Sequence, residues 1–181
     1  MLTSPEPALE SRKAFSASLL EASLSRFGHA GFRDGQLDIL QSVLEGKDTV
    51  AVMPTGGGKS LCYQLPAVYL EGITLVISPL IALMRDQVSK LRSQGVAAGF
   101  LCSNQEMDQK RQVFQEMQEA QSYLLYISPE RVQKPGFEQW FANAPVVRIA
   151  IDEAHCISQW GMDFRQDYAT LSVLRQWEPA V

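Results

Sequence analysis

Residues 53–60 read Met53-Pro54-Thr55-Gly56-Gly57-Gly58-Lys59-Ser60, and no other stretch says as much about how the chain folds. We expect a strand over the apolar run 49–52 that precedes them and a helix over residues 61–69 that follow. Three consecutive glycines let backbone N–H groups turn toward a bound phosphate, where a side chain would block the approach. Lys59 would supply positive charge to the β- and γ-phosphates of a nucleotide, and the Ser60 hydroxyl would be a magnesium ligand. The stretch therefore predicts a strand–loop–helix unit that binds a nucleoside triphosphate.

The general pattern for such loops begins with a glycine, and Met53 stands at that position here. A glycine-rich turn that contains Gly-Lys-Ser by coincidence is the alternative interpretation of residues 53–60. A second motif elsewhere in the chain favours the nucleotide interpretation.

That motif is Asp152-Glu153-Ala154-His155, which follows an apolar run over residues 146–151 that we expect to be a buried parallel strand. Open α/β sheets place their sites at the carboxyl ends of such strands. Asp152 would hold magnesium through water, Glu153 would polarise an attacking water as general base, and His155 would sense the state of the γ-phosphate. Taken alone, these acids fit a plain strand end followed by a turn. Two motifs in this order, each after an apolar run, favour nucleotide hydrolysis.

Short apolar runs alternate with helix-like segments along the chain from the glycine-rich loop onward. We expect strands over residues 73–77, 97–101, 123–127 and 146–151. Helices are expected over residues 81–94 and 104–120, because apolar residues recur there three and four positions apart. The predicted buried stripe of the second of these helices is Val113, Phe114 and Met117. The alternation predicts an α/β fold, with a parallel sheet covered by helices on both faces.

Further helices are expected over residues 15–27 and 36–44, ahead of the glycine-rich loop, and over residues 168–177 near the end of the chain. Asp34 is placed to cap the helix at 36–44, and Gly46 is placed to end it. Residues 1–14 predict a disordered tail, which leaves residues 15–181 as one domain.

The composition is that of an ordinary globular protein. With 181 residues, 46% apolar and 20% charged, the chain is long enough for one buried core. The net charge of −4 gives no general attraction for nucleic acid, so such binding would need a local patch. The three cysteines lack metal-ligand spacing and predict reduced thiols in a cytoplasmic protein; they are Cys62, Cys102 and Cys156. No apolar run is long enough to span a membrane, and no signal peptide is evident.

Residues 15–178 resemble the first motor domain of RecQ-type DNA helicases of helicase superfamily 2. The loop at 53–60, followed by Leu61-Cys62-Tyr63-Gln64-Leu65-Pro66-Ala67, is similar to the family's phosphate loop, including its methionine, and residues 152–155 are similar to its DEAH box. The resemblance implies a RecA-like P-loop NTPase domain that uses ATP and Mg²⁺, and 3′–5′ DNA unwinding by full-length members. It assigns the metal ion to Ser60 and Asp152, catalysis to Lys59, Asp152, Glu153 and His155, and the nucleotide to His29, Arg33, Gln36, Thr55, Gly56, Gly57, Gly58, Lys59 and Ser60.

The stretch Phe27–Gln36 is similar to the family's adenine-reading motif. The Gln36 amide would donate to one adenine ring position and accept from the exocyclic amine, while Arg33 would stack on the base. His29, where the family often has Tyr, would lie on the other face of the base. Standing alone, this stretch would be interpreted as a solvated polar turn between helices.

Residues 158–165 resemble the family's aromatic-rich loop, which couples DNA engagement to ATP turnover; Met162 and Gln166 stand where His and Pro are frequent. Aromatic rings stack on unpaired bases, although packing of these rings in a core is the alternative. The stretches 78–87 and 128–131 resemble two DNA-backbone motifs, and Ser-Pro after a strand is also a plain helix start. The implied DNA-binding residues are Ser78, Gln159, Trp160, Phe164 and Arg165.

The family pattern continues with a second RecA-like domain that carries the arginine finger, and the 181 residues contain no such stretch. We therefore expect a fragment that binds ATP, Mg²⁺ and DNA weakly and does not unwind DNA, because translocation needs two domains that close on the nucleotide. The alternatives are a nucleotide-binding module without turnover and another superfamily-2 motor, such as an RNA helicase. A small-molecule kinase is disfavoured, because no lid or acceptor-binding signature is present.

Overall fold

The computed structural model describes residues 24–157 and 165–177. The predicted tail at 1–14 and residues 15–23 of the predicted helix at 15–27 lie outside these ranges. The chain divides into two compact units, Met1–Pro66 and Ala67–Val181. The first unit holds the glycine-rich loop and the second holds the sheet, so the single domain expected over residues 15–181 stays a prediction.

The described part of the first unit consists of short helices joined by loops. It contains the 3₁₀ turn η2 (Ser25–Phe27), α2 (Gln36–Leu44) and the beginning of α3 (Leu61–Tyr69), which runs on into the second unit. The predicted bounds of α2 are confirmed. Gly46 ends this helix as expected, with a positive φ of 75° and its N–H donating to the carbonyl of Val43.

The predicted cap of α2 is wrong. Gly35, not Asp34, is the N-cap residue; it has a φ of 77°, and no side chain caps the helix. A capping side chain bonds to the backbone N–H two or three positions further on. Asp34 therefore lies one residue outside the register in which its carboxylate would cap the helix.

The strand expected over residues 49–52 is also absent: these residues form no strand in the described structure. Val50 is 92% exposed and Val52 is 93% exposed. A β-branched run favours extended backbone, but a strand forms only where a neighbouring strand accepts its hydrogen bonds. All four described strands lie between residues 72 and 151, and none of them pairs with this run.

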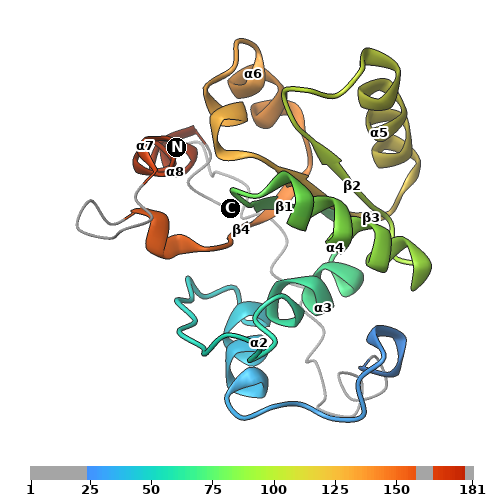
Figure 1. Ribbon diagram of the computed structural model, residues 1–181, viewed down its shortest axis with the longest axis vertical. Coiled ribbons are helices and arrows are strands. Elements are labelled where there is room, and N and C mark those ends of the chain that lie inside the picture. The colour runs from blue at the N-terminus through green and yellow to red at the C-terminus, as the bar shows by residue number, and fades with distance from the viewer. Residues whose placement is uncertain (1–23, 158–164, 178–181) are drawn as a thin grey trace, which may run out of the picture. The chain divides into compact units, whose positions relative to one another are not determined.

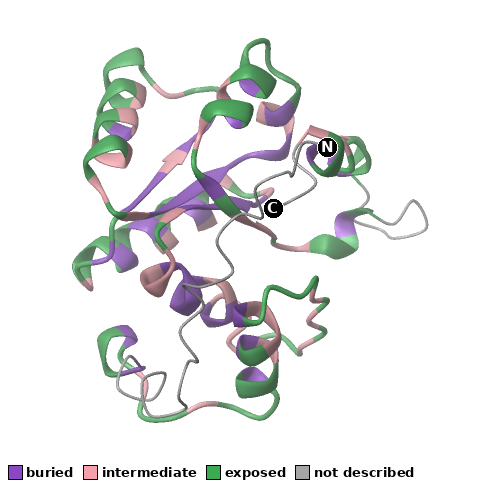
Figure 2. Cartoon of the chain, turned by 180° about the vertical axis from the view of Figure 1, so that it is seen from behind, coloured by how far each residue is buried: buried purple, intermediate pink, exposed green. Residues whose placement is uncertain are grey.

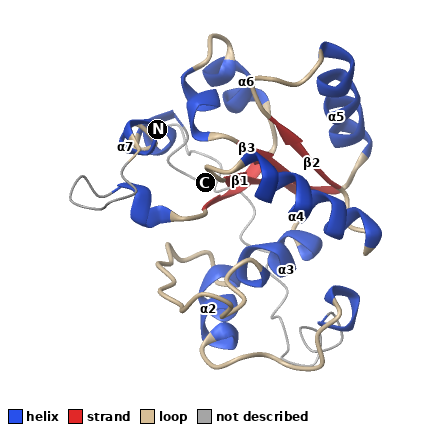
Figure 3. Ribbon diagram, viewed as in Figure 1, coloured by secondary structure: helices blue, strands red, loops and turns tan. Residues whose placement is uncertain are grey.

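The second unit is built on a four-stranded parallel sheet, drawn red in Figure 3. Its strands are β1 (Gly72–Ile77), β2 (Ala98–Leu101), β3 (Ser122–Ile127) and β4 (Val146–Ile151), in the order β2-β3-β1-β4. The two inner strands, β1 and β3, are buried along five of their six residues, whereas the edge strand β4 is partly exposed. The α/β class and the parallel sheet are confirmed.

Helices cover both faces of this sheet (Figure 1). Alternate residues of β1 and β3, among them Leu75 and Leu125, join one apolar core with α5 (Met107–Glu119) and α6 (Phe137–Asn143). On the opposite face, α4 (Ile81–Ser93) packs against β2 and β3. Figure 2 shows the strands buried and the outer faces of the helices exposed.

Shorter elements complete the second unit: the 3₁₀ turns η3 (Pro129–Gln133) and η4 (Ala154–Ile157), then α7 (Gln166–Ala169) and α8 (Val173–Trp177). One continuous helix was expected over residues 168–177, and this is wrong, because α7 and α8 are separate. At the break, the Thr170 hydroxyl donates to the carbonyl of Asp167 at 2.9 Å and accepts from the Gln133 side chain at 3.1 Å. Such local side-chain bonds compete with the helical pattern.

The cysteines Cys62, Cys102 and Cys156 all lie in the described part of the chain; each is buried, and none forms a disulfide. Among the described residues, no helix is long and apolar enough to cross a membrane.

Candidate functional site

The glycine-rich loop has a backbone that requires its glycines. Gly56 and Gly58 have φ values of 77° and 84°, a region that residues with a side chain rarely adopt. A side chain at Gly57 would be obstructed as well, because its Cβ would lie 2.9 Å from the Pro54 carbonyl oxygen. The loop is closed by the Gly57 N–H, which donates to that same oxygen at 2.9 Å. Backbone conformation thus disfavours side chains at Gly56 and Gly58, and the Pro54 carbonyl obstructs one at Gly57.

Two polar residues, Lys59 and Ser60, end this loop directly before α3. The Lys59 ammonium group donates to the carbonyls of Met53 and Pro54 at 3.4 and 3.5 Å, so it lies across the loop. The Ser60 carbonyl accepts from the Gln64 N–H at 3.0 Å, which sets the first turn of the helix. Thr55 is exposed on the loop. Lys59 and Ser60 therefore enter the loop from a helix N-terminus, a position that favours anions.

The predicted adenine-reading residue Gln36 meets this loop directly. Its side chain is 2% exposed, and its Nε2 donates to the Gly58 carbonyl at 3.0 Å and to the Gly57 carbonyl at 3.4 Å. Its Oε1 accepts from the Arg33 N–H at 2.8 Å. A Cβ at Gly58 would lie only 2.4 Å from Nε2. Two motifs that are more than twenty residues apart in the sequence are therefore joined by one side chain.

His29 is half-buried in the same unit, and its N–H donates to the Leu24 carbonyl at 3.0 Å. The Arg33 side chain is exposed. Both ends of the Gln36 amide are bonded to main-chain groups, so adenine reading by Gln36, with His29 and Arg33 at the base, stays a prediction.

The acidic motif lies at the carboxyl end of β4 in the second unit. The Asp152 N–H donates to the carbonyl of Ile77, the last residue of β1, at 2.9 Å. Glu153 has a φ of 53° and is the one non-glycine residue with positive φ in the described chain. Its N–H donates to the Asp152 carboxylate at 3.0 Å. A non-glycine residue held in this region costs energy and is found most often at functional sites.

Contacts from other residues hold the turn at Glu153 in place. The His155 Nδ1 lies 3.3 Å from the Glu153 carboxylate, and the Cys156 N–H donates to the Glu153 carbonyl at 2.9 Å. The hydroxyl of Tyr168, a residue that is 1% exposed, donates to the Asp152 carbonyl at 2.8 Å. Burial raises the pKa of this hydroxyl, so it stays a donor. Tyr168 thereby connects α7 to the acidic turn.

The sheet brings the ends of all four strands to one edge. Ile77 is paired with Ile127 and with Ile151, and Leu101 is paired with Ile127. The residues that follow therefore lie side by side at this edge: Ser78, Cys102, Ser128 and Asp152. The stretches 78–87 and 128–131 therefore start at the same edge of the sheet.

Ser78 and Ser128 are nonetheless buried, with 1% and 2% exposure. The Ser128 hydroxyl donates to Glu130 at 2.6 Å, and the Ser78 hydroxyl has no hydrogen-bond partner among the described residues. Contact of Ser78 with DNA stays a prediction, and it requires the covering groups to move.

Of the predicted aromatic-rich loop, only the last residue falls within the described ranges. Arg165 is exposed, its N–H donates to the Cys156 carbonyl at 3.0 Å, and its guanidinium donates to the Pro79 carbonyl at 3.4 Å. Arg165 thus joins the end of β1 to the segment after the acidic turn. Gln159, Trp160, Met162 and Phe164 lie outside the described residues.

Sequence reasoning missed the residues that hold these segments together. Tyr168 was expected only as part of a helix, and the pairing of Gln133 with Asp167 and Thr170, at 3.1 Å each, was not expected at all. No sequence pattern marks these contacts, because each depends on turns that bring distant residues together.

The chemistry of the donors fits a magnesium nucleotide. In the first unit, phosphate is matched by the glycine backbone and Lys59, and the Ser60 hydroxyl is an oxygen donor of the kind that Mg²⁺ prefers. In the second unit, the Asp152 carboxylate is also such a donor. The described residues contain no group of three or more His, Cys, Asp or Glu that would hold a metal ion by itself.

Comparisons with known proteins agree on one family. The family model described as DEAD/DEAH box helicase matches residues 33–180. The chain is 48% identical over 175 residues to the ATP-dependent DNA helicase RecQ of Haemophilus influenzae, covering 97% of this chain and 28% of that protein. It is 47% identical to the probable ATP-dependent DNA helicase RecS of Bacillus subtilis, and 44% identical to the ATP-dependent helicase SGS1 of Saccharomyces cerevisiae. Those two matches cover 83% of this chain each, and 30% and 11% of the relatives.

Proposed function

Because the chain belongs to the DEAD/DEAH box helicase family, we propose that it is the ATP-binding part of an ATP-dependent DNA helicase of the RecQ type. The observation that carries this proposal is the glycine-rich loop whose backbone needs residues without side chains, with Lys59 lying across it. The chain spans less than a third of the length of the curated relatives named above. Unwinding with 3′–5′ polarity is therefore proposed for a protein that carries this chain together with a second motor domain.

Each of the two motifs would have its own task in ATP hydrolysis. Lys59 would leave the carbonyls of Met53 and Pro54 and offset the charge of the β- and γ-phosphates. Glu153 would accept a proton from the attacking water, and Asp152 would hold the metal ion together with Ser60. Bound magnesium would neutralise charge that develops on the phosphate oxygens.

Coupling to DNA would run through the segments that brace the acidic turn. Arg165 contacts the Pro79 carbonyl at the end of β1, and Tyr168 contacts the Asp152 carbonyl. DNA that binds residues 158–165 and displaces them would thus change the position of the turn that carries Glu153. His155, at 3.3 Å from the Glu153 carboxylate, would respond to the same movement.

The test is ATP hydrolysis by the 181-residue chain, and by a form that carries a second motor domain, each with and without single-stranded DNA. We expect DNA-stimulated turnover only in the longer form, and its loss in Glu153→Gln. Equal stimulation by DNA and RNA would favour the alternative of an RNA helicase. Nucleotide binding without turnover in either form would favour a binding module and contradict the proposal.

A further inference from the structure

Arg131 is a half-buried cation that interacts electrostatically with Glu130 but forms no ion pair in the described chain. Its side chain makes no hydrogen bond or ion pair among the described residues, and its Nε atom is sealed from solvent. The neighbouring Glu130 carboxylate is bonded instead by the Ser128 hydroxyl, at 2.6 Å. A buried donor without an acceptor is costly, and more so when it carries charge. A hydrogen-bond acceptor on a bound molecule would therefore stabilise the Arg131 guanidinium.

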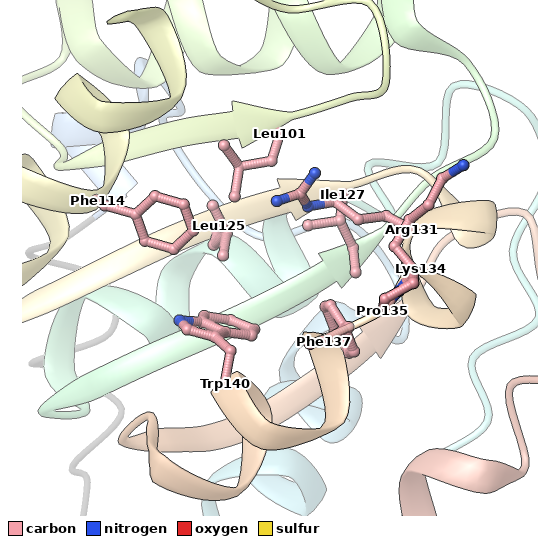
Figure 4. A pocket seen from close by; sticks show the side chains of 10 residues that line it. Leu101, Phe114, Leu125, Ile127, Arg131, Lys134, Pro135, Phe137 and Trp140 are labelled. Carbon is pink, nitrogen blue, oxygen red and sulfur yellow. The ribbon is translucent and has the colours of Figure 1, made fainter. Parts of the chain in front are cut away.

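The guanidinium group reaches into a pocket of about 180 Å³ in the second unit. Figure 4 shows it extending between Leu101 and Ile127, with the rings of Phe114, Phe137 and Trp140 on the other side of the pocket. Lys134 also lines the pocket, and its ammonium group points away from these rings. The lining residues come from β2, α5, β3, η3, α6 and the segment between η3 and α6, so the pocket lies within one compact unit.

The aromatic walls of the pocket are set by packing in the core. The rings of Phe114 and Trp140 pack edge to face with their centroids 6.3 Å apart, and the ring centroids of Phe137 and Trp140 are 5.3 Å apart. A cavity of about 150 Å³ with apolar walls is large enough to bind benzene. The pocket therefore has room for one apolar group of about the size of a phenyl ring.

We propose that this pocket binds a carboxylate that carries one large apolar group, with the carboxylate on Arg131 and the apolar group against Phe114, Phe137 and Trp140. Charge complementarity selects the anion, because Arg131 and Lys134 are the charged side chains of the lining. Burial lowers the pKa of the Arg131 guanidinium, although the nearby Glu130 carboxylate acts in the opposite direction.

A nucleotide of DNA fits this lining less well. A base carries several polar edge atoms, acceptors as well as donors, that need partners, whereas the polar side-chain groups that line the pocket, those of Arg131, Lys134 and Trp140, are all donors. Although Arg131 belongs to the stretch 128–131 that resembles a DNA-backbone motif, its guanidinium faces the apolar walls (Figure 4). Binding in this pocket is therefore separate from the proposed helicase function.

The test is a titration of the 181-residue chain followed by NMR at the Arg131 Nε–H and the Trp140 indole N–H. The probes are 3-phenylpropionate, its neutral amide, an acetylated tripeptide Gly-Gly-Phe with a free C-terminus, and oligothymidylate. We expect both carboxylates to shift these two signals and the amide to bind roughly tenfold to a hundredfold more weakly. Tighter binding of the peptide would identify the C-terminus of a protein as the source, and tighter binding of the free acid a small metabolite; either result supports the site.

Variants separate the charge from the fold. Arg131→Gln should weaken 3-phenylpropionate by a similar factor, whereas Arg111→Gln, an exposed arginine on α5 paired with Asp108, should leave it unchanged. Equal binding of acid and amide would overturn the proposal, since the pocket would then be merely apolar. Failure of both carboxylates to shift the two signals would overturn it too, as would displacement of 3-phenylpropionate by oligothymidylate at these signals. The amide arm needs no variant, so the test holds even if Arg131→Gln does not fold.

Discussion

Tyr168→Phe removes a single hydroxyl and with it the bond that holds the acidic turn to α7. The lost bond is the one from the Tyr168 hydroxyl to the Asp152 carbonyl, which is 2.8 Å long and partly buried. Deleting such a bond costs about 1 kcal/mol net, and up to about 2 kcal/mol where the acceptor is left unsatisfied. If the lost energy falls on the conformation that holds Glu153 at its φ of 53°, 1 kcal/mol lowers the population of that conformation about fivefold.

The assay is urea unfolding of the 181-residue chain, together with kcat and KM for ATP in a form that hydrolyses ATP. We expect Tyr168→Phe to lose about 1–2 kcal/mol of unfolding free energy and about fivefold in kcat, with KM little changed. Tyr123→Phe is the matched control, because Tyr123 is also buried and its hydroxyl bonds to Glu116 at 3.1 Å, away from the acidic turn. A control that loses as much kcat as Tyr168→Phe, or a Tyr168→Phe enzyme with unchanged kcat, would refute the role of this bond.

Two further predictions concern the loop and the effect of pH. Gly58→Ala should destabilise the chain by about 1–2 kcal/mol and weaken ATP binding at least roughly tenfold, because Gly58 has a φ of 84° and its new Cβ would meet Gln36 Nε2 at 2.4 Å. Gly31→Ala is the control, because a Cβ at Gly31 would have no atom within 4 Å. Equal effects of the two substitutions would contradict this reasoning. Burial raises the pKa of the Cys62 thiol from 9.0 to about 11 and that of the Tyr123 hydroxyl from 10.0 to about 12. Both groups stay neutral in the fold while the unfolded chain ionises, so their contribution to stability should be constant below pH 9 and fall as pH rises from 9 to 12. Urea midpoints should show this fall, and it should be shallower between pH 9 and 11 in Cys62→Ala. A flat profile from pH 9 to 12 would show that these groups are not buried.

The strands of the sheet could be predicted because each contains an apolar run that is long enough to be recognised in the sequence. β1, β3 and β4 begin within a residue of the predicted positions, and α4 begins at Ile81 as predicted. The run at 49–52 has the same composition, yet Val50 and Val52 are exposed. Composition records a preference for extended backbone, whereas a strand also needs a partner, which composition does not specify.

Turns were harder to predict, because they depend on single backbone angles. Asp34 has the residue type of a cap, but the left-handed residue directly before the helix is Gly35, which is therefore the N-cap residue. The break between α7 and α8 follows from bonds of Thr170 to Asp167 and Gln133. No periodic pattern contains this information.

The site was predictable as two motifs and not as a set of contacts. The residue types of the phosphate loop and of the acidic strand end carry their chemistry in the sequence, and their positive φ angles agree with a specialised backbone at Gly56, Gly58 and Glu153. The bond from Gln36 to the Gly58 carbonyl and the pocket beside Arg131 needed the fold, since each joins residues from separate elements.

Equilibrium binding of a fluorescent ATP analogue to the 181-residue chain, with and without Mg²⁺, examines the proposed nucleotide site with the fewest assumptions. Lys59→Ala should weaken Mg²⁺-dependent binding at least roughly tenfold, because it removes the ammonium group that lies across the loop. Lys47→Ala is the matched control, since Lys47 is 67% exposed and pairs with Glu45 outside the loop. Binding that is lost in Lys59→Ala and kept in Lys47→Ala is the expected result; equal affinity in the wild type and both variants would contradict the assignment of residues 53–60 to ATP.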